Sequence, residues 1–349
     1  GMASNICGFN LTEVCKTTIA YIKNPDCNLM ETLTAPDFTT GGELIYSAEE
    51  IQRIYETGRG GFRVRAKYRI DQKNNLIEIF EIPYTTTIEA IIDKTVELVK
   101  AGKIREISDM RDESDLSGLK IAIELKRGTD PDKLMQKLYK MTPLMDSFSC
   151  NFNILIEGNP RVMGVREILD EWTAWRLLCI KRRIFADVSR KEEKLHKLLG
   201  LRKILLDIDR AIKIIRETEE EAEVVPNLMI GFGIDEIQAE FVAEIKLRNI
   251  NKQYILEMVA EVDDLKAEIA DLKDILESKL RLRNIIISEL NDIIKKFPSE
   301  RKTTIVYQDE VSDYNEEEHI EDYPCHLFLS RHSYFKKITP LSLRMSGEQ

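Results

Sequence analysis

Two long stretches whose apolar residues recur with gaps of three and four constrain this chain more than any other feature. The first lies within residues 165–216, which hold no proline and a single glycine, Gly200. The second lies within residues 254–297 and shifts its spacing at Leu280. Such spacing is typical of a coiled-coil seam, and the shift is typical of a stutter. The seam positions are Leu198, Leu201, Leu205, Ile208, Ile212 and Ile215, and then Met258, Val262, Leu265, Ile269, Leu272 and Leu276.

These two helices predict an antiparallel hairpin. Each carries an apolar stripe that must be covered, so neither helix is stable alone in water. The simplest arrangement has an outgoing helix at residues 166–216, a returning helix at residues 253–297, and the tip between them at residues 217–252.

The tip is predicted to contain a further helix over residues 234–250. Its apolar face includes Ile237, Phe241 and Ile245, and this face is too large for a loop end that projects into water. We expect a second copy of the chain to cover it, because a two-fold contact buries the same patch on both copies. The alternative is that the face folds back onto the hairpin.

The remaining residues alternate between short extended and short helical segments, so the predicted class is α+β. Residues 1–165 are expected to form an α/β domain, with a β-hairpin over 61–70 and 76–80. A strand is expected over 119–125 and helices over 87–100 and 130–142. Residues 298–349 are expected to hold a strand at 303–307, an acidic linker at 308–323, and a final hairpin.

The charge of the chain is uneven. The net charge of −10 argues against nucleic acid as a partner, because phosphate binding is largely electrostatic. Residues 59–69, however, contain five cations and no acid. Four of them would share one face of a continuous strand and match the spacing of phosphates. The alternative is a solvated outer face of the sheet. The cations are Arg59, Arg63, Arg65, Lys67 and Arg69.

No enzymatic signature is present. The sequence contains no phosphate-binding loop, no zinc-protease motif and no nucleophile elbow. The six cysteines form no CxxC pair and the four histidines are dispersed, so we predict no metal site. Residues 112–115 could ligate a hard cation, but they are more typical of a turn. No membrane span or signal peptide is predicted, which favours the cytoplasm.

Five segments, in order along the chain, resemble the breakage-reunion (A) subunit of the bacterial type IIA DNA topoisomerases, which are gyrase and topoisomerase IV. The resemblance does not distinguish the two enzymes. It implies that residues 1–165 form the tower domain and that the tip is the exit-gate dimerisation domain. The segments are residues 33–42, 57–60, 81–84, 107–115 and 234–239.

The resemblance also implies which residues act. The family cleaves DNA with a tyrosine that follows an arginine in a winged-helix domain. None of the eleven tyrosines here follows an arginine, so we expect this chain to lack that domain and its catalytic group. The family bends its DNA with an apolar wedge, which matches Leu33 here. An ordinary core leucine is the alternative.

The function expected from the resemblance is that of one part of an ATP-dependent topoisomerase. That enzyme passes one duplex through a transient double-strand break in another. This part would bind and bend double-stranded DNA and form a homodimer. ATP and Mg²⁺ would be used by the enzyme's other (B) subunit, and no cofactor is expected in this chain. The alternative is a non-catalytic DNA-bending or scaffolding protein with the same architecture.

Overall fold

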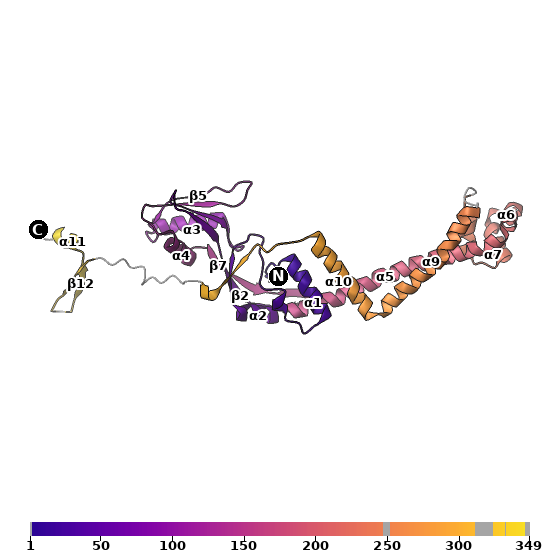
Figure 1. Cartoon of the computed structure of the whole chain (residues 1–349), viewed down its shortest axis with the longest axis horizontal. Helices are drawn as coiled ribbons and strands as arrows, with labels where there is room; N and C mark the ends of the chain where they lie inside the picture. Colours follow the sequence, from indigo (N-terminus) through magenta and orange to yellow (C-terminus); the bar gives the residue numbers. More distant parts are fainter. Residues whose placement is uncertain (1, 247–251, 311–323, 332, 346–349) are drawn as a thin grey trace. The chain divides into compact units, whose positions relative to one another are not determined.

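The computed structural model describes residues 2–246, 252–310, 324–331 and 333–345 (Figure 1). The chain divides into two compact units. The strands β2 (Arg59–Arg65) and β7 (Met145–Asn151) each carry the chain from one unit to the other. The first unit comprises Gly1–Thr39, Ser47–Phe62 and Phe148–Thr303, and the second comprises Thr40–Tyr46, Arg63–Ser147 and Thr304–Gln349.

The second unit contains a four-stranded antiparallel sheet with the order β3-β4-β6-β5. Alternate residues of the two central strands, including Ile79 and Ile123, are fully buried and pack against the two helices. The other face carries charged side chains such as Glu78. The elements are β3 (Lys67–Asp71), β4 (Leu76–Glu81), β5 (Ile107–Asp112), β6 (Ile121–Leu125), α3 (Ile88–Lys100) and α4 (Pro131–Met141).

The two helices of this unit begin where the sequence predicts. The Thr87 side chain accepts a hydrogen bond from the backbone N–H of Ala90, and the Asp130 side chain caps α4 ahead of Pro131. The predicted pairing of residues 61–70 with 76–80 is confirmed for the part that forms β3 and β4. The predicted strand at 119–125 is confirmed as β6.

The remaining strands of the second unit are short. The strand β1 (Glu43–Tyr46) pairs in parallel with β10 (Thr304–Tyr307) and antiparallel with β2. The predicted C-terminal hairpin is confirmed as β11 (His326–Leu329) and β12 (Phe335–Ile338), followed by α11 (Pro340–Met345). Most of the predicted acidic linker lies outside the described residues.

A helical hairpin dominates the first unit. It is formed by α5 (Val165–Ile204), α9 (Lys252–Glu277) and α10 (Lys279–Lys296). In Figure 1, α5 and α9 run side by side. Ion pairs show that the helices are antiparallel, since Lys191 pairs with Glu268 at 2.5 Å while Lys194 pairs with the earlier Glu261 at 2.6 Å. The predicted hairpin is therefore confirmed.

Neither predicted helix is continuous. The outgoing helix breaks at the 3-10 turn Leu205–Asp207, where the Asp207 side chain caps α6 (Ile208–Glu217). The returning helix breaks at Ser278, whose side chain caps α10. Leu280, the predicted stutter position, is 69% exposed, and the buried seam resumes at Leu282. Side-chain oxygens that accept backbone N–H groups favour helix starts over helix interiors, which explains both breaks.

The base of the hairpin carries the N-terminal elements. Helix α1 (Leu11–Lys23) packs Cys15 and Ile22 against apolar residues of α5 and α10. The other elements are α2 (Ala48–Thr57), β8 (Asn153–Ile156) and β9 (Asn159–Val162). The tip contains α6, the 3-10 turn Glu221–Glu223, α7 (Val224–Phe232) and α8 (Glu236–Ala243).

Candidate functional site

The predicted row of cations is divided between two sheets. Strand β2 ends at Arg65, and β3 begins at Lys67 in a different sheet. The residue between them, Ala66, is fully buried, and its backbone N–H donates to the carbonyl of Leu144 at 2.7 Å. The prediction that Arg63, Arg65, Lys67 and Arg69 share one face of a single strand is therefore wrong.

Three of the five cations are neutralised by carboxylates. Arg65 Nε lies 2.6 Å from Glu43 Oε2, and Lys67 Nζ lies 3.0 Å from Glu81 Oε2. Arg69 pairs with Glu78. Each of these pairs joins neighbouring strands or the segments beside them, so the pairs stabilise the sheets and leave less positive charge for a ligand.

Glu78 shows how firmly these charges are held. Hydrogen bonds from Lys120 and Arg69 keep the pKa of the Glu78 carboxyl below its usual value. The carboxylate is therefore ionised at neutral pH.

The Arg65 guanidinium also lies over the ring of Tyr139, 5.4 Å from its centroid. Within the described residues, Arg59 and Arg63 form no ion pair, so these two keep free charge.

Leu33 is a core residue and not an exposed wedge. Its side chain is 2% exposed, and its backbone N–H donates to the carbonyl of Leu29 at 2.9 Å. The following residues are held by Arg301, which donates to the carbonyls of Ala35 and Pro36 at 2.7 and 2.9 Å. The exposure on which the wedge prediction depended is absent, and the alternative of an ordinary core leucine describes this position.

The three predicted gate residues lie on or beside α8, but they differ in exposure. Ile237 is 51% exposed. Phe241 and Ile245 are half-buried and pack against the tip core that includes Leu201 and Leu228. The helix ends at Ala243 and not at residue 250, and residues 247–251 lie outside the described part. Two of the three side chains thus fold back onto the hairpin, as the alternative stated.

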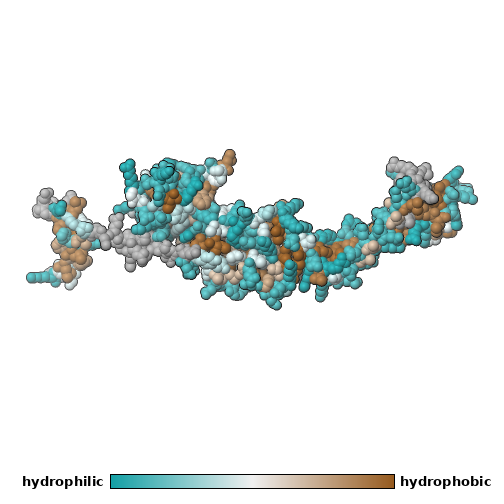
Figure 2. All heavy atoms as spheres, in the orientation of Figure 1, coloured by the Kyte–Doolittle hydropathy of each residue, from teal (hydrophilic) through white to brown (hydrophobic). Residues whose placement is uncertain are grey.

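The tip exposes apolar side chains that sequence reasoning missed. Leu206 is 89% exposed and Ile230 is 84% exposed. Figure 2 shows apolar atoms gathered over the tip helices. Leu206 lies within the 3-10 turn Leu205–Asp207 that interrupts the outgoing helix, so its exposure depends on an interruption that the seam pattern does not reveal. Ile237 is a third exposed apolar side chain here, so apolar side chains on α7, on α8 and in the turn before α6 are left uncovered by the described chain.

The segment at residues 234–239 docks α8 onto α5. The Asp235 and Gln238 side chains form a capping box, and Gln238 Nε2 also donates to the carbonyl of His196 at 2.8 Å. His196 Nε2 lies 2.6 Å from Asp235 Oδ2. Gly200 leaves the space that Gln238 fills, because a Cβ at Gly200 would lie 2.6 Å from the Cβ of Gln238. This segment therefore fixes the position of the tip helix.

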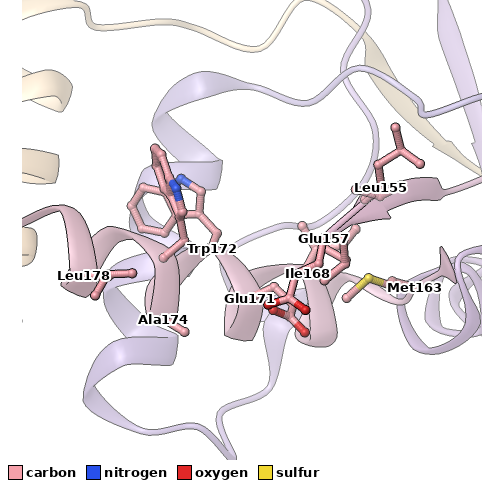
Figure 3. A pocket seen from close by; sticks show the side chains of 11 residues that line it. Leu155, Glu157, Met163, Ile168, Glu171, Trp172, Ala174 and Leu178 are labelled. Carbon is pink, nitrogen blue, oxygen red and sulfur yellow. The ribbon is translucent and has the colours of Figure 1, made fainter. Parts of the chain in front are cut away.

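An apolar groove of about 570 Å³ lies beside the start of α5 (Figure 3). The indole of Trp172 faces it, and Trp175 is 58% exposed at its edge. Among the described residues that line it, the ionisable side chains are Glu157 and Glu171. The groove therefore offers apolar contact area, but it lacks a nucleophile or a histidine for chemistry.

The acidic residues at 112–115 form a turn. The Asp112 side chain accepts from the backbone N–H of Ser114 at 2.9 Å, and Asp115 accepts from Ser117 at 2.7 Å. This confirms the interpretation as a turn. Among the described residues no group of three histidine, cysteine or acidic side chains is placed to hold a metal ion. None of the helices within those residues is long and apolar enough to cross a membrane.

Comparison with known proteins identifies the family. The family model for the A subunit of DNA gyrase/topoisomerase IV matches residues 1–291. The DNA gyrase A subunit of Borreliella burgdorferi is 34% identical over 358 residues, covering 99% of this chain and 44% of that protein. Its counterpart in Ureaplasma parvum is 37% identical over 347 residues, covering 97% and 41%. That of Halalkalibacterium halodurans is 34% identical over 354 residues, covering 100% and 42%.

The chain therefore belongs to the family of DNA gyrase and topoisomerase IV A subunits, and the resemblance seen in its motifs is confirmed. It spans less than half the length of these relatives. The predicted fold class, an α+β chain with a long helical hairpin, is also confirmed.

Proposed function

We propose that this chain binds double-stranded DNA and forms a homodimer through the tip of its hairpin. It would do so within an ATP-dependent topoisomerase that passes one duplex through a transient break in another. The family match over residues 1–291 and the relatives that align over nearly the whole chain support this proposal. The B subunit of the enzyme would supply the ATPase and Mg²⁺ sites. The sequence of this chain contains no motif for either site.

The observation that carries the dimer proposal is the apolar surface of the tip. Leu206, Ile230 and Ile237 are 89%, 84% and 51% exposed on a small helical tip with its own buried core. If the tip only reversed the direction of the chain, polar residues at these exposed positions would be more favourable in water. A two-fold contact removes these side chains from water on both copies at once. Phe241 and Ile245 would support this surface from beneath.

Sedimentation velocity tests the dimer. Placing a charge at Ile230 or Ile237, as Ile230→Glu or Ile237→Glu, is expected to convert the dimer to a monomer. Leu116→Glu is the matched control, because Leu116 is 109% exposed on the loop between β5 and β6 in the other unit. If Ile237→Glu and Ile230→Glu both sediment as the unaltered dimer, the tip does not form the contact.

The catalytic part of the proposal concerns what this chain does alone. No tyrosine follows an arginine in its 349 residues, so we propose that it neither cuts nor reseals DNA without another domain. Supercoiled plasmid incubated with the chain, the ATPase (B) subunit, ATP and Mg²⁺ is expected to keep its topology. Protein-linked cleavage of the plasmid would contradict this.

A further inference from the structure

The second unit contains a basic hollow that the predicted cation row does not include. The hollow is about 610 Å³ and lies where the segment before β5, the turn after β6 and the start of α4 meet. It is lined by five cations and two carboxylates, a formal excess of three positive charges. The charged lining residues are Arg105, Lys126, Arg127, Lys133 and Lys137, with Glu106 and Asp130.

Both carboxylates of the hollow are already engaged. Glu106 Oε1 lies 2.9 Å from Lys137 Nζ. Burial disfavours the Glu106 carboxylate, but hydrogen bonds led by that from Lys137 hold its pKa below the usual value. Asp130 accepts the backbone N–H groups of Asp132 and Lys133 as the cap of α4. Glu106 therefore balances Lys137, and Asp130 is occupied by the backbone.

The remaining cations have donors left for a ligand. Arg127 and Lys133 are exposed, and neither forms an ion pair with any residue in the described part of the chain. Lys126 Nζ donates to the carbonyl of Arg105 at 2.6 Å, which uses one of its three protons. The Arg105 Nε donates to the carbonyl of Gly102 at 3.3 Å, which leaves its terminal nitrogens available.

The backbone holds these cations together. The N–H of Lys126 donates to the carbonyl of Glu106 at 2.9 Å, which ties the turn after β6 to the segment before β5. Gly128 has a φ of +85°, a conformation that favours glycine and lets the chain turn directly into α4. The turn and the helix start therefore present Arg127 and Lys133 beside Arg105 and Lys126.

We propose that this basic hollow binds the phosphate backbone of duplex DNA, and that it does so more strongly than the predicted row from Arg59 to Arg69. The proposal rests on the function proposed above, in which this chain binds DNA. In the predicted row, Arg65, Lys67 and Arg69 are neutralised by carboxylates. In the hollow, four of the five cations are exposed and form no ion pair with the described residues. Phosphate contacts of this kind carry no base specificity, so they would hold a DNA arm in place without reading its sequence.

Salt-dependent binding of a fluorescent duplex to the chain tests this proposal. Removing two charges with Arg127→Gln and Lys133→Gln is expected to reduce the magnitude of the negative slope of log K against log salt by about 0.9 to 1.8, and to weaken binding at low salt. The charge-conserving variant, Arg127→Lys with Lys133→Arg, is expected to keep the slope of the unaltered chain. A control that removes two other exposed charges of the same unit, Lys73→Gln with Lys94→Gln, is expected to change it less.

Results that differ from these expectations would overturn the proposal, and they show whether DNA binding as a whole or only the hollow is at fault. If the unaltered chain binds no duplex even at low salt, the proposed DNA-binding function fails along with the hollow. If the chain binds and the Arg127 and Lys133 variant keeps the full slope, only the hollow is refuted. Equal losses from the Lys73 and Lys94 control would show a general charge effect. Loss of binding to phosphatidylglycerol vesicles, with duplex binding unchanged, would assign the hollow to a membrane surface instead.

Discussion

Arg301 and Glu13 form an ion pair although they lie 288 positions apart in the chain. The guanidinium Nη2 lies 2.6 Å from Glu13 Oε2, and the same guanidinium donates to the carbonyls of Ala35 and Pro36. One side chain thus joins α1, the segment after Leu33 and the residues that follow α10. This contact makes the Leu33 region part of the core of the first unit.

Replacing Arg301 with alanine should destabilise the first unit. The two side chains are only 19% and 23% exposed, so the change leaves a poorly solvated carboxylate and two carbonyls without their donor. We expect a loss of about 2–4 kcal/mol in the free energy of unfolding. Urea denaturation followed by circular dichroism measures it.

Arg53→Ala provides the comparison for Arg301, because Arg53 pairs with Glu50 across 3.8 Å on the surface with 65% and 45% exposure. That pair should contribute at most about 1 kcal/mol. Equal effects of the two substitutions would show that Arg301 has no special role.

Gly200→Ala should loosen the tip. The new Cβ would lie 2.6 Å from the Cβ of Gln238, and Gln238 is held by its own hydrogen bonds to His196 and Asp235. Overpacking typically costs about 1–3 kcal/mol, which exceeds the gain of about 1 kcal/mol from alanine in a helix. Faster hydrogen exchange in α8 is the expected signal.

Gly231→Ala is the matched substitution in the same tip. There the added Cβ meets only the terminal Cδ1 of Ile214, at 2.7 Å. That methyl group can rotate away, so the substitution should be neutral or stabilising. Greater disturbance from Gly231→Ala than from Gly200→Ala would contradict the docking role of Gln238.

The buried cysteines should be protected from alkylation. Burial, followed by the hydrogen bond with Cys150, raises the pKa of the Cys7 thiol, and burial also raises that of Cys15. Their thiolates are therefore scarce in the folded state, and iodoacetamide reacts with the thiolate. Cys27, Cys179 and Cys325, which are half-buried, should react first.

The pH dependence follows from the sign of these shifts. Because the folded pKa of Cys7 is raised above the unfolded value, its contribution to stability is complete below about pH 8.5 and is lost as the pH rises further. Mass spectrometry of labelled peptides over this range should show Cys7 unreacted until the chain unfolds. Rapid labelling of Cys7 at neutral pH would show that the N-terminal segment opens.

The sequence was sufficient to predict the helical hairpin and the fold class, but it did not predict how the candidate site residues are placed. Regular apolar spacing reports which helix face is covered, so the hairpin of α5 and α9 could be predicted. Period-two alternation continues through Ala66, however, and gives no sign that the strand divides there. The segment that follows Leu33 is held by Arg301, which lies 266 positions beyond Ala35, and no local pattern reveals such a contact. The basic hollow is formed by the pairing of β5 with β6, which brings Arg105 close to Arg127.

The ion pairs of Glu289 should make the base of the hairpin sensitive to acid. Glu289 on α10 lies 2.7 Å from Arg176 and 2.8 Å from Arg183, both on α5. Burial opposes the charged form, but hydrogen bonds from the two arginines lower the pKa of Glu289 overall. Because the pKa of Glu289 is lower in the folded state than in the unfolded state, the charged carboxylate stabilises the fold above the unfolded-state pKa, about 4.5. This stabilisation is lost as the pH falls through the folded-state pKa.

Glu289→Gln should therefore lower Tm near pH 7 and reduce the difference in Tm between pH 7 and about pH 3.5. Glu217→Gln is the control, because Glu217 lies 3.9 Å from Lys213 and is 67% exposed. Differential scanning calorimetry across this range measures both variants. If Glu289→Gln retains the full acid sensitivity of the unaltered chain, the two arginine contacts do not link α5 to α10 in solution.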